Sequence, residues 1–363
     1  MKTDVLITNI IIKPMQCDSF CKYCYLKRNP KNTELIEPYV YEGILKNNIR
    51  GILEFSKAYF NCPIIKICGG EVFLISNLKE LVQELLEYYP YVLIQTNGKH
   101  FTKENIKWII ELKRVFIQIS LDGHTVEMNE YRSFNEESLK NLLYAIETLR
   151  RNNVYVELIS VLNNLNTRYY DEFLDYLYQL PFGDIKNSFK VTPIYLMDNT
   201  EKYRASKEDS ETIERIIKRY NKYKYILPPK QYIKLILKLM RGEKLKYKCH
   251  NSIVSLNFTD DGKIKACTNI LPENILNVGD IFAENHEALV AKFGKTKFQK
   301  LLLNTEKRLP NCQECFNFCS IYNLYFNDTF SLEELCENNY LYNLPEVKEI
   351  LTKVKKVTTI LKH

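Results

Sequence analysis

The chain has 363 residues, and its 51 Lys and Arg against 44 Asp and Glu give a net charge of +7. A composition of 45% hydrophobic and 26% charged residues is typical of a folded soluble protein, which excludes a disordered or fibrous chain. No apolar run approaches the roughly 18 residues of a membrane span, and the N-terminus lacks signal-peptide features. We therefore expect a cytoplasmic protein with no membrane partner. Because the excess charge is mild and scattered, we expect no nucleic acid as partner either.

The first 195 residues alternate β-rich and helical segments. Strands are expected at about 5–13, 64–68, 91–96, 115–121, 154–162 and 189–195, with helices at 36–60, 77–89, 103–113, 136–152 and 167–180. The near-continuous apolar strands indicate a parallel sheet covered on its faces, so the fold class is α/β. Six βα units fall short of a closed eight-stranded barrel, which predicts an open, curved partial (β/α)6 barrel with ligands at the carboxyl ends of its strands.

The rest of the chain divides into three further parts. We predict a barrel over 1–196, a helical connector over 197–247, a cysteine-bearing extension over 248–340 and a C-terminal helix over 341–363. In the extension, SIVSLNF and KIKAC flank the turn TDDG, which predicts a hairpin in which Gly262 supplies a positive φ.

Eleven cysteines in a chain without an export signal indicate metal ligands or catalytic thiols rather than disulfides. Cys17, Cys21 and Cys24 form a C-x3-C-x2-C motif directly after the first strand. Three thiolates on one loop can hold three irons of a [4Fe–4S] cube and leave the fourth iron open to a ligand. A zinc knuckle is the alternative, but a structural zinc site needs four ligands, and no fourth Cys or His lies nearby.

Polar residues follow the second and fourth strands. Gly69–Glu71 can let a ligand approach the backbone and offer a carboxylate to an ammonium group. Ser120 and Asp122 suit sugar hydroxyls, and Arg132 suits a carboxylate. Each of these also has an ordinary interpretation as a turn or a surface charge. Together they describe a site for an amino acid joined to a nucleoside.

With these motifs in this order, residues 5–195 resemble the radical S-adenosylmethionine (SAM) superfamily. The resemblance implies that Cys17, Cys21 and Cys24 hold a [4Fe–4S] cluster whose open iron binds SAM, and that an electron from it yields a 5′-deoxyadenosyl radical. The implied SAM contacts are Tyr23 for adenine, Gly69, Gly70 and Glu71 for the amino group, Ser120 and Asp122 for the ribose, and Arg132 for the carboxylate. Gln95–Gly98 is similar to the third-strand end of relatives with extra clusters.

The C-terminal cysteines resemble the SPASM/Twitch extension of that superfamily. Cys249, then Gly262 and Cys267, match its hairpin, and Cys312-x2-Cys315 would complete four ligands of an auxiliary iron–sulfur cluster; a zinc ribbon is the alternative. A full SPASM domain has C-x2-C-x5-C-x3-C, whereas this chain has Cys312-x2-Cys315-x3-Cys319 followed by SIYN. Two ligand sets therefore stay open: one cluster on Cys249, Cys267, Cys312 and Cys315, or a second cluster on Cys312, Cys315, Cys319 and Cys336.

The resemblance favours an enzyme that abstracts a hydrogen atom from a peptide or protein, as in the maturation of a ribosomally made peptide, with an electron donor such as flavodoxin or ferredoxin. A sulfatase maturase is less expected, because Thr268 and Asn269 follow Cys267 where those relatives carry Asp. A Twitch-type dehydrogenase or carbon-skeleton enzyme on a sugar or other small metabolite is the alternative, and a non-catalytic electron carrier or zinc protein is the candidate from another class. Cys68 is either a hydrogen-atom donor or a packed thiol.

Overall fold

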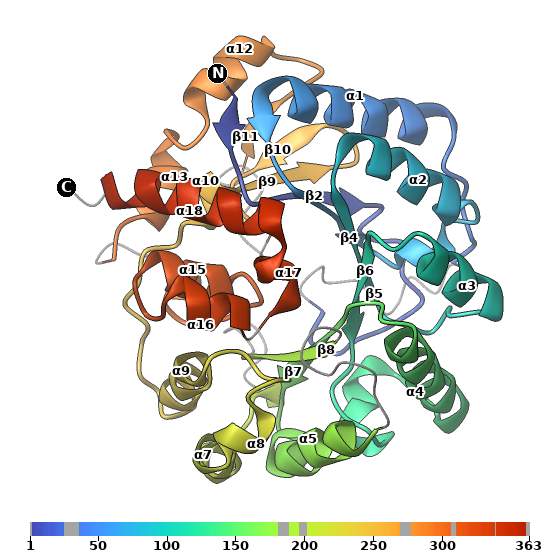
Figure 1. Cartoon of the computed structure of the whole chain (residues 1–363), viewed down its shortest axis with the longest axis vertical. Coiled ribbons are helices and arrows are strands. Elements are labelled where there is room, and N and C mark those ends of the chain that lie inside the picture. Colours follow the sequence, from blue (N-terminus) through green and yellow to red (C-terminus); the bar gives the residue numbers. More distant parts are fainter. Residues whose placement is uncertain are drawn as a thin grey trace.

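A parallel sheet of βα units forms the centre of the molecule (Figure 1). The computed structural model describes residues 2–24, 36–180, 189–195, 202–268, 277–305, 310–337 and 339–360. Six parallel strands confirm the predicted partial barrel, and the order β2-β4-β5-β6-β7-β8 follows the chain. Their bounds are β2 (Ile7–Ile12), β4 (Ile64–Gly69), β5 (Tyr91–Thr96), β6 (Val115–Ser120), β7 (Val156–Leu162) and β8 (Phe189–Tyr195).

The helices between these strands form where apolar residues recur at helical spacing, and they bury those residues against the sheet. They are α1 (Gly43–Tyr59), α2 (Leu78–Tyr88), α3 (Lys103–Glu111), α4 (Glu136–Arg151) and α5 (Tyr170–Gln179). A capping box between Asn135 and Ser138 starts α4. The predictions differ at two ends: α1 begins at Gly43 rather than at 36, and the helix predicted from 167 opens with a 3-10 turn, η3 (Thr167–Tyr169).

The predicted hairpin is present and extends the barrel sheet. Strands β9 (Ser255–Thr259) and β10 (Lys263–Lys265) are antiparallel, and Gly262 in their turn has φ +86°. β9 pairs in parallel with β2, and β11 (Asn277–Asp280) pairs with β10, so one sheet of nine strands runs from β11 to β8. Elsewhere, β1 (Thr3–Asp4) and β3 (Phe60–Asn61) form a small separate pair.

The connector contains the expected helices, α7 (Ser210–Lys218), α8 (Tyr220–Tyr223) and α9 (Lys230–Met240). The predicted boundary at 196/197 lies outside the described residues, and so do the last three residues of the predicted C-terminal helix. The remaining helices are α10 (Asn251–Val254), α12 (His286–Lys292), α13 (Lys297–Leu302), α14 (Pro310–Gln313), α15 (Ser320–Phe326), α16 (Leu332–Glu337), α17 (Tyr340–Asn343) and α18 (Pro345–Ile360).

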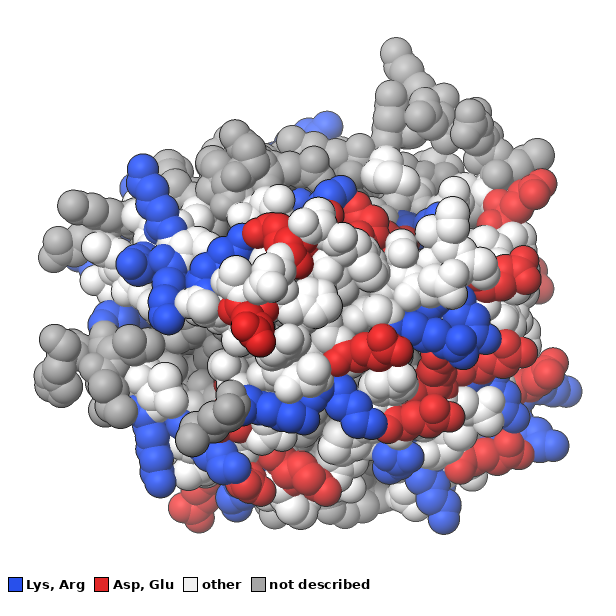
Figure 2. All heavy atoms as spheres, turned by 90° about the horizontal axis from the view of Figure 1, so that it is seen from above, with Lys and Arg blue, Asp and Glu red and all other residues white. Residues whose placement is uncertain are grey.

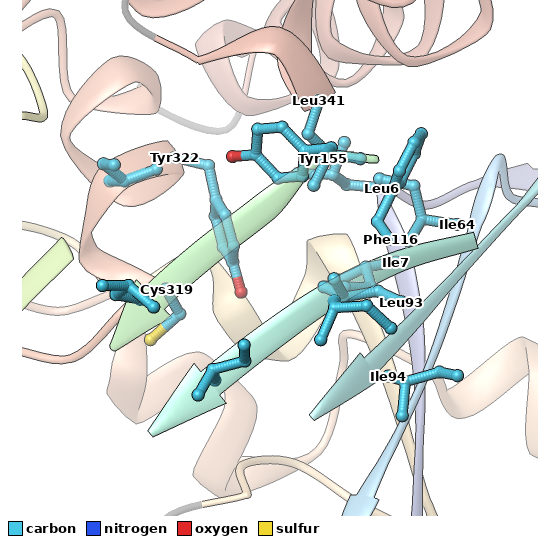
Figure 3. Packing of buried hydrophobic residues seen from close by; sticks show 14 of the residues in the cluster. Leu6, Ile7, Ile64, Leu93, Ile94, Phe116, Tyr155, Cys319, Tyr322 and Leu341 are labelled. Carbon is cyan, nitrogen blue, oxygen red and sulfur yellow. The ribbon is translucent and has the colours of Figure 1, made fainter. Parts of the chain in front are cut away.

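Helix α17, one of the red C-terminal helices in Figure 1, packs at the amino ends of β6 and β7. The ring of Tyr340 lies 6.2 Å from that of Phe116 and 6.0 Å from that of Tyr155, and the Tyr155 hydroxyl donates to Asn339 at 2.9 Å. Figure 3 shows Tyr155 and Leu341 packed together in this region. Because the helical segment fills this end, a ligand site is expected at the carboxyl ends of the strands.

The surface carries both signs of charge. On the face drawn in Figure 2, basic and acidic side chains are interspersed over the described surface. None of the helices in the described ranges combines the length and the apolar character needed to cross a bilayer.

Candidate active site

The cysteine loop follows β2 and packs against the end of β4. The backbone N–H of Gly70 donates to the Ile12 carbonyl at 3.2 Å, and that of Glu71 donates to the Gln16 carbonyl at 2.7 Å. A Cβ atom would lie 2.2 Å from the Ile12 oxygen at Gly69 and 1.9 Å from the Gln16 oxygen at Gly70. The paired glycines, predicted to admit a ligand, are therefore required here by the close approach of the cysteine loop itself.

The carboxylate of Glu71 ties the ends of two strands together. It is buried and accepts hydrogen bonds from the backbone N–H of Phe73 at 3.0 Å, the Thr96 hydroxyl at 2.7 Å and the backbone N–H of Asn97 at 2.7 Å. Burial raises the pKa of Glu71, and these three donors partly offset that effect. An ammonium group that bound the Glu71 side chain, as predicted, would compete with these three donors for the carboxylate oxygens, which already hold the turn after β5.

The same turn also holds the cysteine loop from the other side. The Asn97 amide donates to Asp18 at 2.8 Å and to the Ser19 hydroxyl at 2.9 Å, and the His100 ring lies 3.1 Å from the other Asp18 oxygen. These contacts connect the loop to the segment that resembled the third-strand end of the family. The sequence indicated the Gln95–Gly98 motif, but only the tertiary structure shows that this turn is tethered to the cysteine loop.

The thiols of Cys17, Cys21 and Cys24 all lie on this loop and are partly exposed. Burial raises the pKa of Cys17 to about 12, opposed by a hydrogen bond from the Ser19 backbone and reinforced by the charges of Glu71, Asp18 and Cys21. The pKa of Cys21 is also raised, by burial first, with Cys24 among its charged neighbours. The thiols are therefore close enough to interact electrostatically, and they need a metal to hold them as thiolates.

Asp122, Arg132 and Tyr23 form a buried cluster beside the loop. One Asp122 oxygen is 2.9 Å from Arg132 Nε and accepts from the Val161 backbone at 2.8 Å, and the other accepts from the Tyr23 hydroxyl. Burial raises the pKa of Asp122, and Arg132 opposes that effect. The predicted ribose and carboxylate contacts are thus brought together, with Ser120 at the end of β6 beside them. Their assignment to SAM stays a prediction.

A polar row crosses the interior of the barrel, and the sequence analysis did not find it. Lys66 Nζ donates to the Gln118 amide oxygen at 2.5 Å, the Gln118 amide donates to Glu157 at 2.7 Å, and the Thr192 hydroxyl donates to the other Glu157 oxygen at 2.5 Å. All four side chains are buried. The available signal was a polar residue in the interior of an otherwise apolar strand, as in IIKIC and VELIS. Cys68, two residues after Lys66, is also buried, and its catalytic role stays a prediction.

The C-terminal cysteines form a second group of thiols. Burial raises the pKa of Cys319, and the charges of Cys315, Cys249 and Cys267 add to that effect. Hydrogen bonds hold the segments together: the His250 backbone donates to Asn323 in α15 at 2.7 Å, and the Tyr247 hydroxyl donates to the Cys315 carbonyl at 3.1 Å. Cys319 is thus influenced by three cysteines of the first predicted ligand set, and both predicted sets stay predictions.

Cys336 occupies a different environment. It lies in α16, and its thiol donates to the Tyr342 carbonyl at 3.1 Å. Burial raises its pKa, and Lys348 is the charged group that opposes this effect. Cys312 is buried in α14, one helix turn before Cys315. The structure thus favours a structural thiol at Cys336, although its assignment as a ligand, like that of Cys312, stays a prediction.

These two groups of thiols fit iron–sulfur clusters in their chemistry. Among the described residues, no three His, Cys, Asp or Glu side chains converge on one point at the distances of a single metal ion. A cube spreads its ligands over separate irons, so its sulfurs stand farther apart than ligands that share one ion. Thiolates are the ligands that such clusters use, and both groups supply several on short, well-packed segments.

Comparison with known proteins identifies the barrel. Residues 11–177 match the radical SAM superfamily. The sporulation killing factor maturation protein SkfB of Bacillus subtilis (strain 168) is 27% identical over 164 residues, which are 45% of this chain and 37% of that protein. The antilisterial bacteriocin subtilosin biosynthesis protein AlbA of the same organism is 24% identical over 144 residues, 39% of this chain and 30% of that protein. The matches thus span about a third of each of these relatives.

Solved structures share the fold over more of the chain. "Native anSMEcpe with bound AdoMet" has a TM-score of 0.61 at 15% identity and covers 96% of this chain and 99% of that one. Streptococcus suis SuiB bound to precursor peptide SuiA has a TM-score of 0.59 at 14% identity, with 82% of this chain and 66% of that one covered. The partial barrel with its cysteine loop is therefore similar to the radical SAM superfamily in sequence over residues 11–177 and to these structures in fold. Radical SAM proteins use a [4Fe–4S] cluster and SAM.

Proposed function

We propose that this chain is a radical SAM enzyme that abstracts a hydrogen atom from a peptide, in the maturation of a ribosomally made precursor. The observation that carries the proposal is the cysteine loop, which is fixed between the Gly69–Glu71 turn and the turn after β5 and lies beside the Asp122–Arg132 pair. These groups share the carboxyl ends of the strands, where a parallel barrel places its ligands.

When bound, the cluster supplies the electron that divides SAM into methionine and a 5′-deoxyadenosyl radical. The residues of this chain orient SAM and exclude water. Arg132 and Asp122 are both buried, so charged hydrogen bonds there act in a medium of low dielectric constant. The Tyr23 hydroxyl and the Asn129 amide, which accepts from the Asp122 backbone at 2.9 Å, keep this carboxylate in place. The same enclosure protects a reactive radical from solvent.

A peptide as the substrate is supported by the relatives. SkfB is a maturation protein for a killing factor, AlbA serves bacteriocin biosynthesis, and SuiB was solved with a precursor peptide. The C-terminal cysteines support an auxiliary cluster, because the charges of Cys249, Cys267 and Cys315 act on Cys319 and hydrogen bonds join their segments. A one-electron donor such as flavodoxin or ferredoxin would complete the system.

The test is anaerobic incubation of the iron-loaded protein with SAM, dithionite and a candidate precursor peptide encoded next to its gene. We expect 5′-deoxyadenosine and methionine, together with a mass change in the peptide. Cys24→Ala should abolish both products, whereas Cys62→Ala, a matched thiol outside the loop, should retain them. Absence of 5′-deoxyadenosine from the fully loaded protein would contradict the radical reaction, and deoxyadenosine without any modified peptide would contradict the substrate class.

A further inference from the structure

The starting point is a lysine inside the barrel. Lys66 is 1% exposed, and the buried carboxylate of Glu157 lies on the far side of the Gln118 amide, to which that amide donates at 2.7 Å. Its hydrogen bond goes to the neutral amide of Gln118. A buried ammonium group is costly unless an anion compensates it. Glu157 compensates Lys66 only across the Gln118 amide, so an anion on the open side of the ammonium group, toward Phe318 and Cys319, would stabilise it further.

The C-terminal cysteine segment comes directly to this lysine. Lys66 Nζ lies 3.8 Å from the centre of the Phe318 ring, and Cys319 is the next residue. The backbone of this segment is fixed to the barrel, because the Tyr195 N–H at the end of β8 donates to the Phe316 carbonyl at 3.2 Å. Figure 3 shows Cys319 beside Tyr322, with both side chains directed from the C-terminal segment toward the barrel strands.

We propose that Lys66 is the counter-charge of an iron–sulfur cluster held by the group of Cys249, Cys267, Cys315 and Cys319, and that its ammonium group makes this cluster easier to reduce. The inference rests on the proposed auxiliary cluster and adds a positioning residue to it. It uses the position of Lys66 inside the barrel, its neutral partner Gln118 and its contact with Phe318.

The physical reason is electrostatic. A [4Fe–4S] cluster with four thiolates is an anion, and one-electron reduction makes it more negative without a proton. A fixed cation in a medium of low dielectric constant stabilises the reduced form more than the oxidised form. Without the cluster, the thiols are neutral and only Glu157, across the Gln118 amide, offsets the desolvation cost of the same cation. Lys66 should therefore destabilise the metal-free protein and stabilise the loaded one.

The experiment is a redox titration with dithionite, followed by electron paramagnetic resonance. A variant with Cys17, Cys21 and Cys24 replaced by Ala isolates the C-terminal cluster. In this background Lys66→Met should lower the ratio of reduced to oxidised cluster at least tenfold at a given solution potential, which is about 59 mV for a one-electron couple. Lys66→Arg should stay within threefold of the parent. Lys190→Met is the matched control, since Lys190 is also buried in a barrel strand and donates to the Tyr225 carbonyl.

Thermal unfolding gives a second readout that does not depend on the potential. Lys66→Met should raise the melting temperature of the metal-free protein and lower that of the loaded protein, whereas a merely structural role would lower both. If Lys66→Met fails to load iron but Lys66→Arg loads fully, the counter-charge is supported; failure of both overturns it. A loaded Lys66→Met with the parent potential overturns this inference alone. Parent protein that binds iron only at the N-terminal cysteines overturns the auxiliary cluster together with it.

Discussion

Removal of the Glu71 carboxylate should destabilise the protein strongly. Three donors point at it, namely the backbone N–H groups of Phe73 and Asn97 and the Thr96 hydroxyl, and all three bonds are 3.0 Å or shorter. Glu71→Ala leaves these donors without a partner, at about 1–3 kcal/mol each. Allowing for relaxation and entry of water, we expect a loss of about 3–5 kcal/mol in the free energy of unfolding. Urea unfolding of the metal-free protein measures it.

Two further variants sharpen this test. Glu71→Gln retains one accepting oxygen and should lose less, because its amide NH2 replaces one acceptor with a donor. Glu130→Ala is the matched control. The Glu130 carboxylate pairs with Lys22 of the cysteine loop at 2.8 Å, but both side chains are about half exposed, so the loss in the free energy of unfolding should be about 0–1 kcal/mol. If Glu71→Ala lost no more than Glu130→Ala, the carboxylate would not be the tether between the turn and the strands.

Two other predictions concern a carboxylate and two cysteines. Hydrogen bonds from Lys222 and its neighbours outweigh burial and lower the pKa of Asp175 to about 2, so its contribution is present above the ordinary value near 4 and is lost as the pH falls toward 2. Asp175→Asn should therefore cost about 1 kcal/mol in urea unfolding at pH 7 and about half as much at pH 3, the midpoint of this window; an equal loss at both would contradict the charge effect. Cys319→Ala should lower the iron content after anaerobic reconstitution, whereas Cys336→Ala should retain it and lose only the hydrogen bond to Tyr342. The reverse pattern would restore Cys336 as a ligand.

Much of the fold could be predicted from local sequence patterns. Apolar strands such as FIQIS alternate with helical segments at regular intervals, and this pattern fixes the βα order and the partial barrel. The hairpin was readable because Gly262 can adopt a positive φ in a short turn. Spacing also placed Cys17, Cys21 and Cys24 on one loop, since residues so close along the chain have few alternatives.

Contacts between distant segments were decided only by the tertiary structure. The parallel pairing of β9 with β2 joins residues about 250 positions apart, and no local signal specifies a partner at that range. The contact of Glu71 with a ligand stays a prediction, but only the tertiary structure showed that its carboxylate closes the turn after β5, because burial demands that its oxygens find donors. Lys66 is a single charged residue in the apolar strand IIKIC, and its surroundings cannot be read from that strand. Its place beside Phe318 follows from how the C-terminal segment crosses the barrel, and that path is set by packing rather than by sequence spacing.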